Sequence, residues 1–555
     1  MASDIKFEQD ERVLIFGIPF VTLFVWTAST LDPVNLPKMF LLVIFSFALM
    51  PSVITKIYGQ KKTSVPTFVI LNLLIMVWVL VTTITSDTNP IQSFFGVNGR
   101  STGGLTYLSF SLVALATFYL STPKLNSKLL AGLAISGVVN LIYCGLVILT
   151  NKDPIPWTNV YGNILGTFGN PNFISSFLGI FNVVVFAKIL EQGLTKSKIV
   201  GATGLLLLSV FEIIDSQSRQ GLIVTALGCG GVLIYKVFKT KINLIVKIAT
   251  LFFYLFGGVL AVLAMLQIGP LTNYIYKLSV SIRGAYWRAG WETMLHNPLF
   301  GVGPDSFGDW YTRVRDARAM VVPGPDVFTN SPHNVFIEQG ANGGIPLFLI
   351  YLITQVYILS CALRYLKKSS EFNYIFAASF FGWLGFTAQS LISINQIGLA
   401  VWGYVLGAIT VAIYTQSKVE VAGRVIGVNR SKTQKNEFRN ILGFGGAVVG
   451  LILAVPSFYA EANWRTALSS KDLNQIVSAA DQWPQSTDRY IQVSKALYEN
   501  KFDKESLDFV RKGLNFNSNN ARLWYFLYQL PNSTQEEKDT AKSKLKILDP
   551  NFEVK

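Results

Sequence analysis

Long apolar stretches recur along the first 460 positions of this 555-residue chain, and short polar links separate them. A stretch of about 20 apolar residues forms a helix that can cross the roughly 30 Å hydrocarbon core of a membrane. The pattern therefore predicts an all-α fold, a polytopic membrane helical bundle with about thirteen transmembrane helices. The predicted spans cover residues 13–30, 38–55, 66–85, 103–121, 128–150, 171–190, 198–215, 220–238, 245–268, 344–363, 373–392, 395–416 and 438–460.

Composition supports a membrane protein. Hydrophobic residues make up 51% of the chain and charged residues 14%, whereas soluble proteins carry about 25% charged residues. The three cysteines, Cys144, Cys229 and Cys361, fall inside apolar stretches, which argues against a disulfide framework or a thiolate metal site. The N-terminus has neither a basic region nor a small-residue cleavage site before its first apolar stretch, so we expect the first span to act as the insertion signal.

The net charge of +15 indicates membrane orientation rather than a nucleic-acid partner, because the basic residues lie in the links between apolar stretches. Alternate links are rich in lysine and arginine, while the intervening short links hold only Arg100, Lys152 and Arg219. The positive-inside rule then predicts a cytoplasmic N-terminus, with the long loop 269–343 and the C-terminal tail outside. The predicted inside links contain Lys56, Lys61, Lys62, Lys124, Lys128, Lys188, Lys196, Lys198, Lys236, Lys239, Lys241, Arg364, Lys367, Lys368 and the basic run from Lys418 to Arg439.

Residues 461–555 have a different pattern, with sparse apolar residues at helical spacing and many polar ones. Two segments read as helix, turn, helix, and the regions around Tyr490 and Leu523 recur at nearly the 34-residue period of tetratricopeptide repeats. The sequence thus predicts a membrane domain over 1–460 and an extracytoplasmic, tetratricopeptide-like domain over 461–555. A generic helical hairpin domain is the alternative, and either could dock a protein partner.

Charged residues are rare in the span centres, and the polar motifs gather in the predicted outside segments. Each motif has a plain structural reading. Asn170 and Asn172, in "GTFGNPNF", could start a helix, and Arg219, in "DSQSRQG", could extend to the membrane interface. The segment 281–311, with Arg283, Trp287 and Arg288, could be an interfacial helix. His333 and Asn334, in "SPHNVFIEQGANGG", could form a helix cap.

Taken together, "GTFGNPNF", "SQSRQG", "RGAYW…HNPLFGVGPDSF" and "HNVFIEQGANGG" resemble, in order and spacing, the O-antigen ligase/polymerase superfamily over about residues 160–400. That superfamily includes O-antigen ligases, O-antigen polymerases and pilin-type oligosaccharyltransferases. The resemblance implies a bacterial inner-membrane glycosyltransferase that is independent of metal and cofactor. Its donor would be a polyprenyl-diphosphate-linked glycan, and its acceptor a lipid, a growing polysaccharide or a protein.

By the same resemblance, the catalytic residues are Arg219, Arg283 and His333. Arginine binds phosphate oxygens with two parallel hydrogen bonds and stays charged, which suits a departing lipid diphosphate. Histidine titrates near neutral pH and suits the orientation or deprotonation of an acceptor hydroxyl. The expected substrate-binding residues are Arg288, Asn170, Asn172, Asn334 and Trp287.

One departure from the family pattern concerns acceptor handling. Relatives often carry a glutamate about nine residues after the histidine, where this chain has Asn342; Glu338 is near but falls on another helical face. His296, the second of two histidines, is expected to be structural. Two other classes of function stay open: a transporter or flippase, which would need midplane charges and internal repeats, and a scaffold that recruits a partner through its tail.

Overall fold

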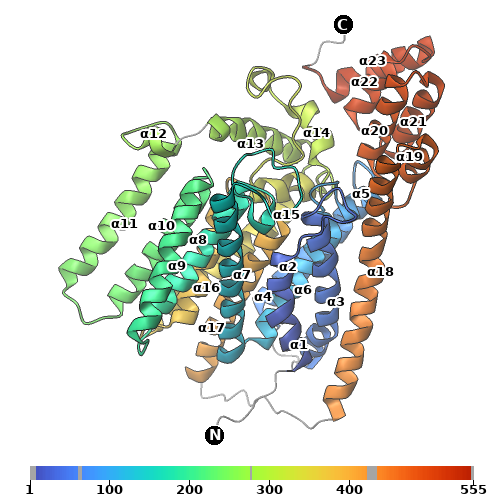
Figure 1. The fold of residues 1–555 in the computed structure, drawn as a ribbon. Coiled ribbons are helices and arrows are strands. Elements are labelled where there is room, and N and C mark those ends of the chain that lie inside the picture. The colour runs from blue at the N-terminus through green and yellow to red at the C-terminus, as the bar shows by residue number, and fades with distance from the viewer. Residues whose placement is uncertain (1–7, 60–64, 276–277, 422–433, 552–555) are drawn as a thin grey trace.

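The computed structural model describes residues 8–59, 65–275, 278–421 and 434–551, which form helices and no β-strand (Figure 1). Within these ranges, ten helices are long and apolar enough to cross a membrane. The predicted all-α polytopic bundle is therefore confirmed. The ten helices are α3 (Asn35–Gly59), α4 (Thr67–Ile84), α7 (Pro123–Thr150), α8 (Pro171–Ile189), α9 (Lys196–Asp215), α10 (Gln220–Phe238), α11 (Leu244–Met265), α15 (Val335–Lys368), α17 (Ile397–Val421) and α18 (Gln434–Ser470).

The other three predicted spans fall on shorter helical segments. Two of them are α6 (Gly104–Leu120) and α16 (Tyr374–Ser390). Neighbouring helices enclose both: α6 packs against α3, α4 and α17, and α16 packs against α8, α10 and α17. Most of their side chains are consequently buried. A helix enclosed by protein does not have to match the lipid thickness by itself.

The third segment comprises α1 (Gln9–Arg12), η1 (Val13–Gly17) and α2 (Ile18–Leu23), so the predicted span over 13–30 is wrong in its second half. The helix ends at Leu23 because a buried lysine binds its last carbonyl groups. Lys38 Nζ donates hydrogen bonds to the carbonyl oxygens of Val21, Thr22 and Phe24 at 3.3, 2.5 and 2.9 Å. A cation at a helix C-terminus satisfies carbonyls that have no partner within the helix.

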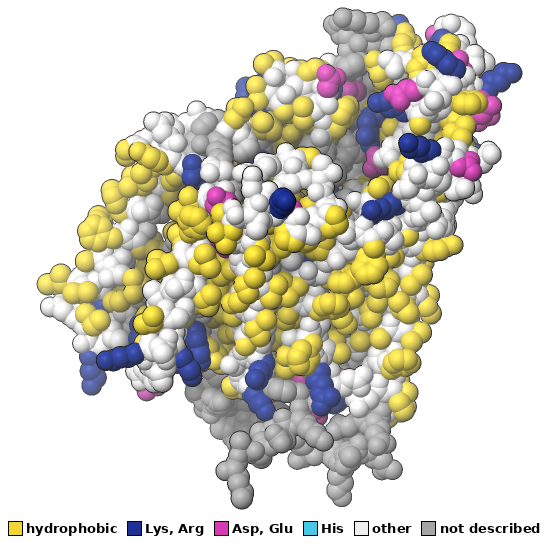
Figure 2. Space-filling view, in the orientation of Figure 1, with side chains coloured by type: hydrophobic (Ala, Val, Ile, Leu, Met, Phe, Trp, Pro, Cys, Tyr) yellow, Lys and Arg dark blue, Asp and Glu magenta, His cyan; other side chains and the backbone are white. Residues whose placement is uncertain are grey.

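The two ends of the bundle differ in charge. At the end that we call the basic end, lysines lie in the last turns of α8, α10 and α15, and Figure 2 shows dark blue side chains below a broad hydrophobic belt. Lys239, for example, donates to the carbonyls of Leu366 and Ser369. Lys61, Lys62 and residues 422–433 of the predicted basic run lie outside the described residues.

The opposite end, which we call the site end, carries most of the short helices that do not span the bundle (Figure 1). These include α5 (Pro90–Phe95), α12 (Thr272–Ile275), α13 (Leu278–His296) and α14 (Phe307–Val314), so the predicted loop 269–343 is largely helical. The C-terminal helices follow: α19 (Leu473–Ala480), α20 (Thr487–Glu499), α21 (Asp503–Phe516), α22 (Ala521–Gln529) and α23 (Gln535–Leu548).

The C-terminal helices form two hydrophobic clusters of their own. Tyr490 and Leu523, which recur at the predicted period, both lie against Gly513 of α21, where an added Cβ would come within 3.1 Å of each. The relationship to tetratricopeptide repeats stays a prediction. The predicted boundary at 460 falls inside α18, which continues unbroken into the domain and buries Trp464 in its core.

Buried polar contacts hold this C-terminal domain against α5 and α14. Asp309 of α14 accepts hydrogen bonds from Asn520 Nδ2 (2.7 Å) and Asn517 Nδ2 (3.0 Å). Arg315, whose side chain is fully buried, forms an ion pair with Asp549 at 2.7 Å. Paired buried charges are costly to separate, so the domain is a fixed part of the site end.

A break divides α15 at Gly344, whose φ of 69° lies in the left-handed region. The segment "NPLFGVG", residues 297–303, enters this break. The N–H groups of Val302 and Gly303 donate to the carbonyls of Ala341 and Asn342 at 3.0 and 2.9 Å, and Ile345 N–H donates to Pro298 at 2.8 Å. Two of the motifs that carry the family resemblance therefore meet, and the backbone groups freed by the break are satisfied.

We expect Lys38→Met to lower the free energy of unfolding by about 3 kcal/mol, because three carbonyl groups in an apolar setting would each lose a donor. Thermal unfolding in detergent, followed by tryptophan fluorescence, measures the change as a lower Tm. Lys56→Met in the last turn of the same helix is the matched control, since Lys56 is partly exposed. Equal Tm values for the two variants would contradict the capping role of Lys38.

Candidate active site

His333 lies at the junction between the long loop and α15. Its φ of 53° places it in the left-handed region, which few residues other than glycine adopt. The neighbours hold this conformation: His333 N–H donates to Ser331 Oγ at 3.1 Å. The next residue, Asn334, caps α15, because its Oδ1 accepts the N–H groups of Phe336 and Ile337 at 3.0 and 3.2 Å. The capping interpretation of Asn334 is confirmed, and its predicted substrate contact stays a prediction.

Helix α13 supports the imidazole. The ring of Tyr286 stacks on that of His333, with centroids 5.5 Å apart and planes 26° apart. Trp287 Nε1 donates to the carbonyl of His333 at 3.4 Å, so Trp287 contacts the backbone of the catalytic candidate. Beneath the pair, Tyr286 packs with Phe307 and Tyr311 in an apolar cluster that joins α13, α14 and α15. The histidine is therefore fixed by packing from three helices.

The surroundings keep His333 uncharged. Burial lowers the pKa of the imidazole to about 3, and the positive charges of Arg283 and Arg100 add to this shift. Arg283, on α13 and one turn before Trp287, is half-buried, and burial also lowers its pKa. Its closest described hydrogen-bond partner is Ser279 Oγ at 3.5 Å. The structure thus brings Arg283 and His333 together as a cation beside a neutral imidazole.

Arg219 belongs to a second group at the same end of the bundle. It precedes the first residue of α10, and its Nε is buried with no hydrogen-bond partner in the described part of the chain. Next to it, Ser218 Oγ donates to Asn172 Oδ1 at 2.9 Å, which joins the "SRQG" and "NPN" motifs. Asn170 caps α8 by accepting the N–H of Asn172 at 2.8 Å, as the structural reading predicts. An arginine with an unused buried donor is poised for an anionic partner.

Arg288 and His296 lie further from the imidazole along α13. Arg288 Nε forms a 2.8 Å ion pair with Asp316. Burial raises the pKa of Asp316, but the hydrogen bonds from Arg288 and Ala319 and the nearby positive charges together lower it below its ordinary value. Arg288 therefore ties the loop after α14 to α13, and its role in substrate binding stays a prediction. His296 is exposed at the end of α13, where Nδ1 lies 2.8 Å from the carbonyl of Glu292.

A buried ionic cluster, which the sequence analysis missed, lies behind His333. Arg100 pairs with Glu338 at 2.5 Å and with Asp305 at 3.4 Å, and each of these side chains is at most 4% exposed. Arg100 Nη1 also donates to the carbonyl of Asn330 at 2.8 Å. Burial lowers the pKa of Arg100, but the two carboxylates raise it above its ordinary value. The only sign of this cluster in the sequence is that Arg100 is one of the few basic residues in the predicted outside links.

Asn342, where the family pattern departs, is also buried, and its Oδ1 has no hydrogen-bond partner among the described residues. Its backbone carbonyl accepts the N–H of Gly303, so the residue is part of the break in α15. Within the described ranges, no group of three or more His, Cys, Asp or Glu side chains could hold a metal ion.

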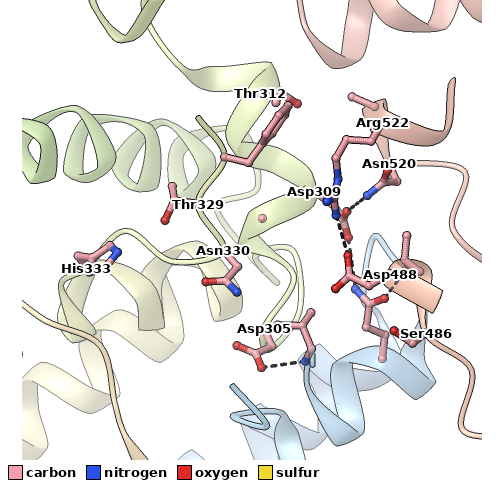
Figure 3. A pocket seen from close by; sticks show the side chains of 16 residues that line it. Asp305, Asp309, Thr312, Thr329, Asn330, His333, Ser486, Asp488, Asn520 and Arg522 are labelled. Atoms are coloured by element: carbon pink, nitrogen blue, oxygen red, sulfur yellow. Dashed lines mark hydrogen bonds and ion pairs between the residues drawn. The ribbon is translucent and has the colours of Figure 1, made fainter. Parts of the chain in front are cut away.

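A cavity of about 400 Å³ opens beside His333. One wall comes from the segment 305–333, and the other from the starts of α20 and α22 in the C-terminal domain. Figure 3 shows His333 on one side, Asp488, Asn520 and Arg522 on the other, and Asn330 between them. The imidazole is consequently accessible from a polar space outside the bundle.

Comparison with known proteins bears on this site. Residues 204–352 match the family described as O-Antigen ligase. The matched region includes Arg219, Arg283 and His333 but covers less than half of the chain, and it contains neither Asn170, Asn172 nor the C-terminal domain. No curated protein matches the chain. The match supports the O-antigen ligase resemblance and a membrane glycosyltransferase-like function with lipid-linked glycan and acceptor substrates.

We expect Glu338→Gln to destabilise the protein by about 3–5 kcal/mol, because it leaves the buried Arg100 with one carboxylate where it had two. Arg288→Gln breaks an ion pair that is 48% and 37% exposed, and exposed pairs contribute at most about 1 kcal/mol. Thermal unfolding of both variants in detergent makes the comparison. A loss for Glu338→Gln no larger than that for Arg288→Gln would show that the cluster does not stabilise the site.

Proposed function

We propose that this protein moves a glycan from a polyprenyl-diphosphate donor to an acceptor hydroxyl at the outer face of the cytoplasmic membrane of a bacterium. One observation carries the proposal: Arg219, Arg283 and His333 fall within the matched region and lie at one end of a membrane bundle, where His333 borders a polar cavity. The basic end would then face the cytoplasm, in agreement with the distribution of lysine and arginine.

On the donor side, Arg283 and Arg219 bind the diphosphate. The acceptor oxygen attacks the anomeric carbon of the donor sugar as the bond from that carbon to the diphosphate oxygen breaks. The lipid diphosphate leaves with the electron pair, and the arginines stabilise the negative charge that develops on it. Displacement in line with the leaving group inverts the anomeric centre, as the family type implies.

On the acceptor side, the neutral His333 accepts the hydrogen bond of the acceptor hydroxyl, and later its proton. A pKa of about 3 makes the free imidazole a weak base. Binding of an anionic diphosphate beside Arg283 offsets one of the positive charges that lower this pKa. The donor therefore strengthens the base that activates the acceptor, and His333 mainly orients the hydroxyl until the donor is bound.

The same superfamily contains ligases and polymerases, and an O-antigen or exopolysaccharide polymerase is the second candidate. A transporter is less well supported: the buried Lys38 and Glu212 each lie within four residues of a helix end, away from the middle of the membrane. A scaffold would not require an imidazole at the edge of a polar cavity. Analysis of surface glycans after deletion separates a polymerase, whose loss removes long polymer, from a ligase, whose loss leaves unmodified acceptor.

We expect His333→Ala to slow glycan transfer about 100-fold or more, because the acceptor hydroxyl loses its hydrogen-bond acceptor. The measurement is release of polyprenyl diphosphate by the purified protein in lipid nanodiscs, with lipid-linked glycan as donor. His296→Ala, which changes the other histidine on a neighbouring element, is expected to keep full activity. Wild-type-like transfer by His333→Ala, or an inactive wild type, would refute the proposal.

We expect Arg283→Gln to move the acidic limb of the pH–rate profile to higher pH, in addition to lowering the rate. The active imidazole is neutral, and the positive charge of Arg283 disfavours protonation. Without that charge, the pKa of His333 rises, so a larger fraction of the protein is protonated at pH 5. Arg288 is not among the charges that lower the pKa of His333, so Arg288→Gln is expected to leave the acidic limb of the profile in place. Superimposable normalised profiles for Arg283→Gln and wild type would contradict this coupling.

A further inference from the structure

One wall of the cavity beside His333 comes from the C-terminal domain, which lies outside the matched family region. Ser486, Thr487 and Asp488 come from the start of α20, and Asn520, Ala521 and Arg522 from the start of α22. The corresponding ends of two successive helix pairs thus face the loop that carries the imidazole. Figure 3 shows Ser486, Asp488, Asn520 and Arg522 on the side of this space opposite His333.

The C-terminal wall is held in place. Gln92 of α5 accepts a 2.7 Å hydrogen bond from Thr487 Oγ1, and Asp309 of α14 binds Asn517 and Asn520. Burial raises the pKa of Asp309, although the two asparagine amides partly offset this. Because these contacts are satisfied among protein groups, they set the position of the wall and are not available to a ligand.

Other lining groups are available to a ligand. Asp488 and Arg522 form a 2.9 Å ion pair across α20 and α22, with side chains 35% and 45% exposed. The guanidinium of Arg522 also lies 5.9 Å from the centre of the Phe328 ring. Asn330 is exposed between this group and His333. A carboxylate, a guanidinium, an amide and an exposed aromatic face therefore share one polar space.

These groups suit a sugar. A sugar hydroxyl both donates and accepts hydrogen bonds. Carboxylate oxygens can accept from it, and guanidinium and amide N–H groups can donate to it. The ring of Phe328 can cover the apolar face of a pyranose. The charged lining groups are the carboxylates of Asp305, Asp309 and Asp488 and the guanidinium of Arg522. Because Arg522 is already paired with Asp488, the lining offers a phosphate no unpaired cation. The diphosphate of the donor therefore belongs on the arginine side of His333, and this side is left to the acceptor.

We infer that the C-terminal helical domain forms the acceptor subsite, and that Asp488 and Arg522 are specificity-determining residues that bind the hydroxyls of an acceptor glycan. The inference rests on the proposed function and extends it. It gives the C-terminal domain a part in substrate recognition and names the residues that recognise the acceptor. His333 stands where the cavity meets the donor side, so a sugar held by Asp488 and Arg522 can direct a hydroxyl toward the imidazole.

The test uses the full-length protein in nanodiscs with lipid-linked glycan as donor and acceptor concentration as the variable. The probe is lipid-free oligosaccharide released by mild acid from the surface glycan of the host, added as acceptor or competitor. Asp488→Asn and Arg522→Gln are each expected to raise the KM or inhibition constant for this oligosaccharide about tenfold, the effect of one lost charge-assisted hydrogen bond. The KM for the donor is expected to stay unchanged.

Arg511→Gln is the matched control. Arg511 is 45% exposed in the same domain and pairs with Glu537 at 2.8 Å, but it does not line the cavity. It is expected to leave the KM for the oligosaccharide unchanged. Monodispersity and Tm in detergent establish that all three variants are folded. If either cavity variant is unfolded, Asp488→Glu and Arg522→Lys replace them, and the same rise in KM is expected.

Two outcomes would overturn the inference while leaving the proposed function intact. One is an unchanged KM or inhibition constant for the oligosaccharide in Asp488 and Arg522 variants that are folded and active. The other is competition by a serine- and threonine-containing peptide, but not by the oligosaccharide, which would assign the cavity to a protein acceptor. A wild-type protein that releases no polyprenyl diphosphate would instead refute the proposed function itself.

Discussion

At Gly344 the chain passes so close to the backbone of Leu299 that an added Cβ would lie 2.5 Å from its carbonyl oxygen. This approach lets the segment after α13 bond to the two halves of α15, and the rest of the site end depends on it. Residues 333–343 are thereby separated from the spanning part of α15. They consist of His333, its neighbour Asn334 and a short helix that carries Glu338, and contacts with α13 and α14 determine their position. The spanning half of α15 keeps its length in the membrane.

The polar groups of the site end form two sets. The arginines form one: Arg283 lies on α13, and Arg219 Nε, just before α10, is buried with no hydrogen-bond partner among the described residues. The cavity beside His333 forms the other, and it is lined mostly by carboxylates, amides and hydroxyls. The proposed reaction has an anionic leaving group, the lipid diphosphate, and a neutral acceptor hydroxyl. One set of side chains cannot favour both, so the reaction needs two separate sets of binding groups. The buried ion pair of Arg100 and Glu338 belongs to neither set, and it holds the start of α15, next to His333, in position.

Much of the bundle follows from the sequence, because lipid contact requires apolar stretches of nearly constant length. The prediction of span boundaries fails where protein contacts replace lipid contacts. The first helical segment ends at Leu23 because Lys38, from another helix, binds its last carbonyl groups. Arg219, Arg283 and His333 are site candidates because of the motifs in which they stand. Arg100 and Glu338 lie 238 positions apart, and neither stands in a pattern that shows the pairing. The docking of the C-terminal domain likewise depends on single asparagines and aspartates, which look like ordinary surface residues in sequence.

The 37 residues of α18 run as one helix from the basic end into the C-terminal domain, a length of about 55 Å. A change in the length of such a helix both moves the attached domain along the helix axis and rotates it around that axis. Each residue added or removed within it would turn the domain by about 100° around the helix axis, and Asp488 and Arg522 would face away from His333. A change of a whole turn would restore the direction but move the domain by about 5.4 Å along the axis, which would break its hydrogen bonds to Gln92 and Asp309. The length of α18 between the bundle and the domain is therefore set by the site that the two parts form together.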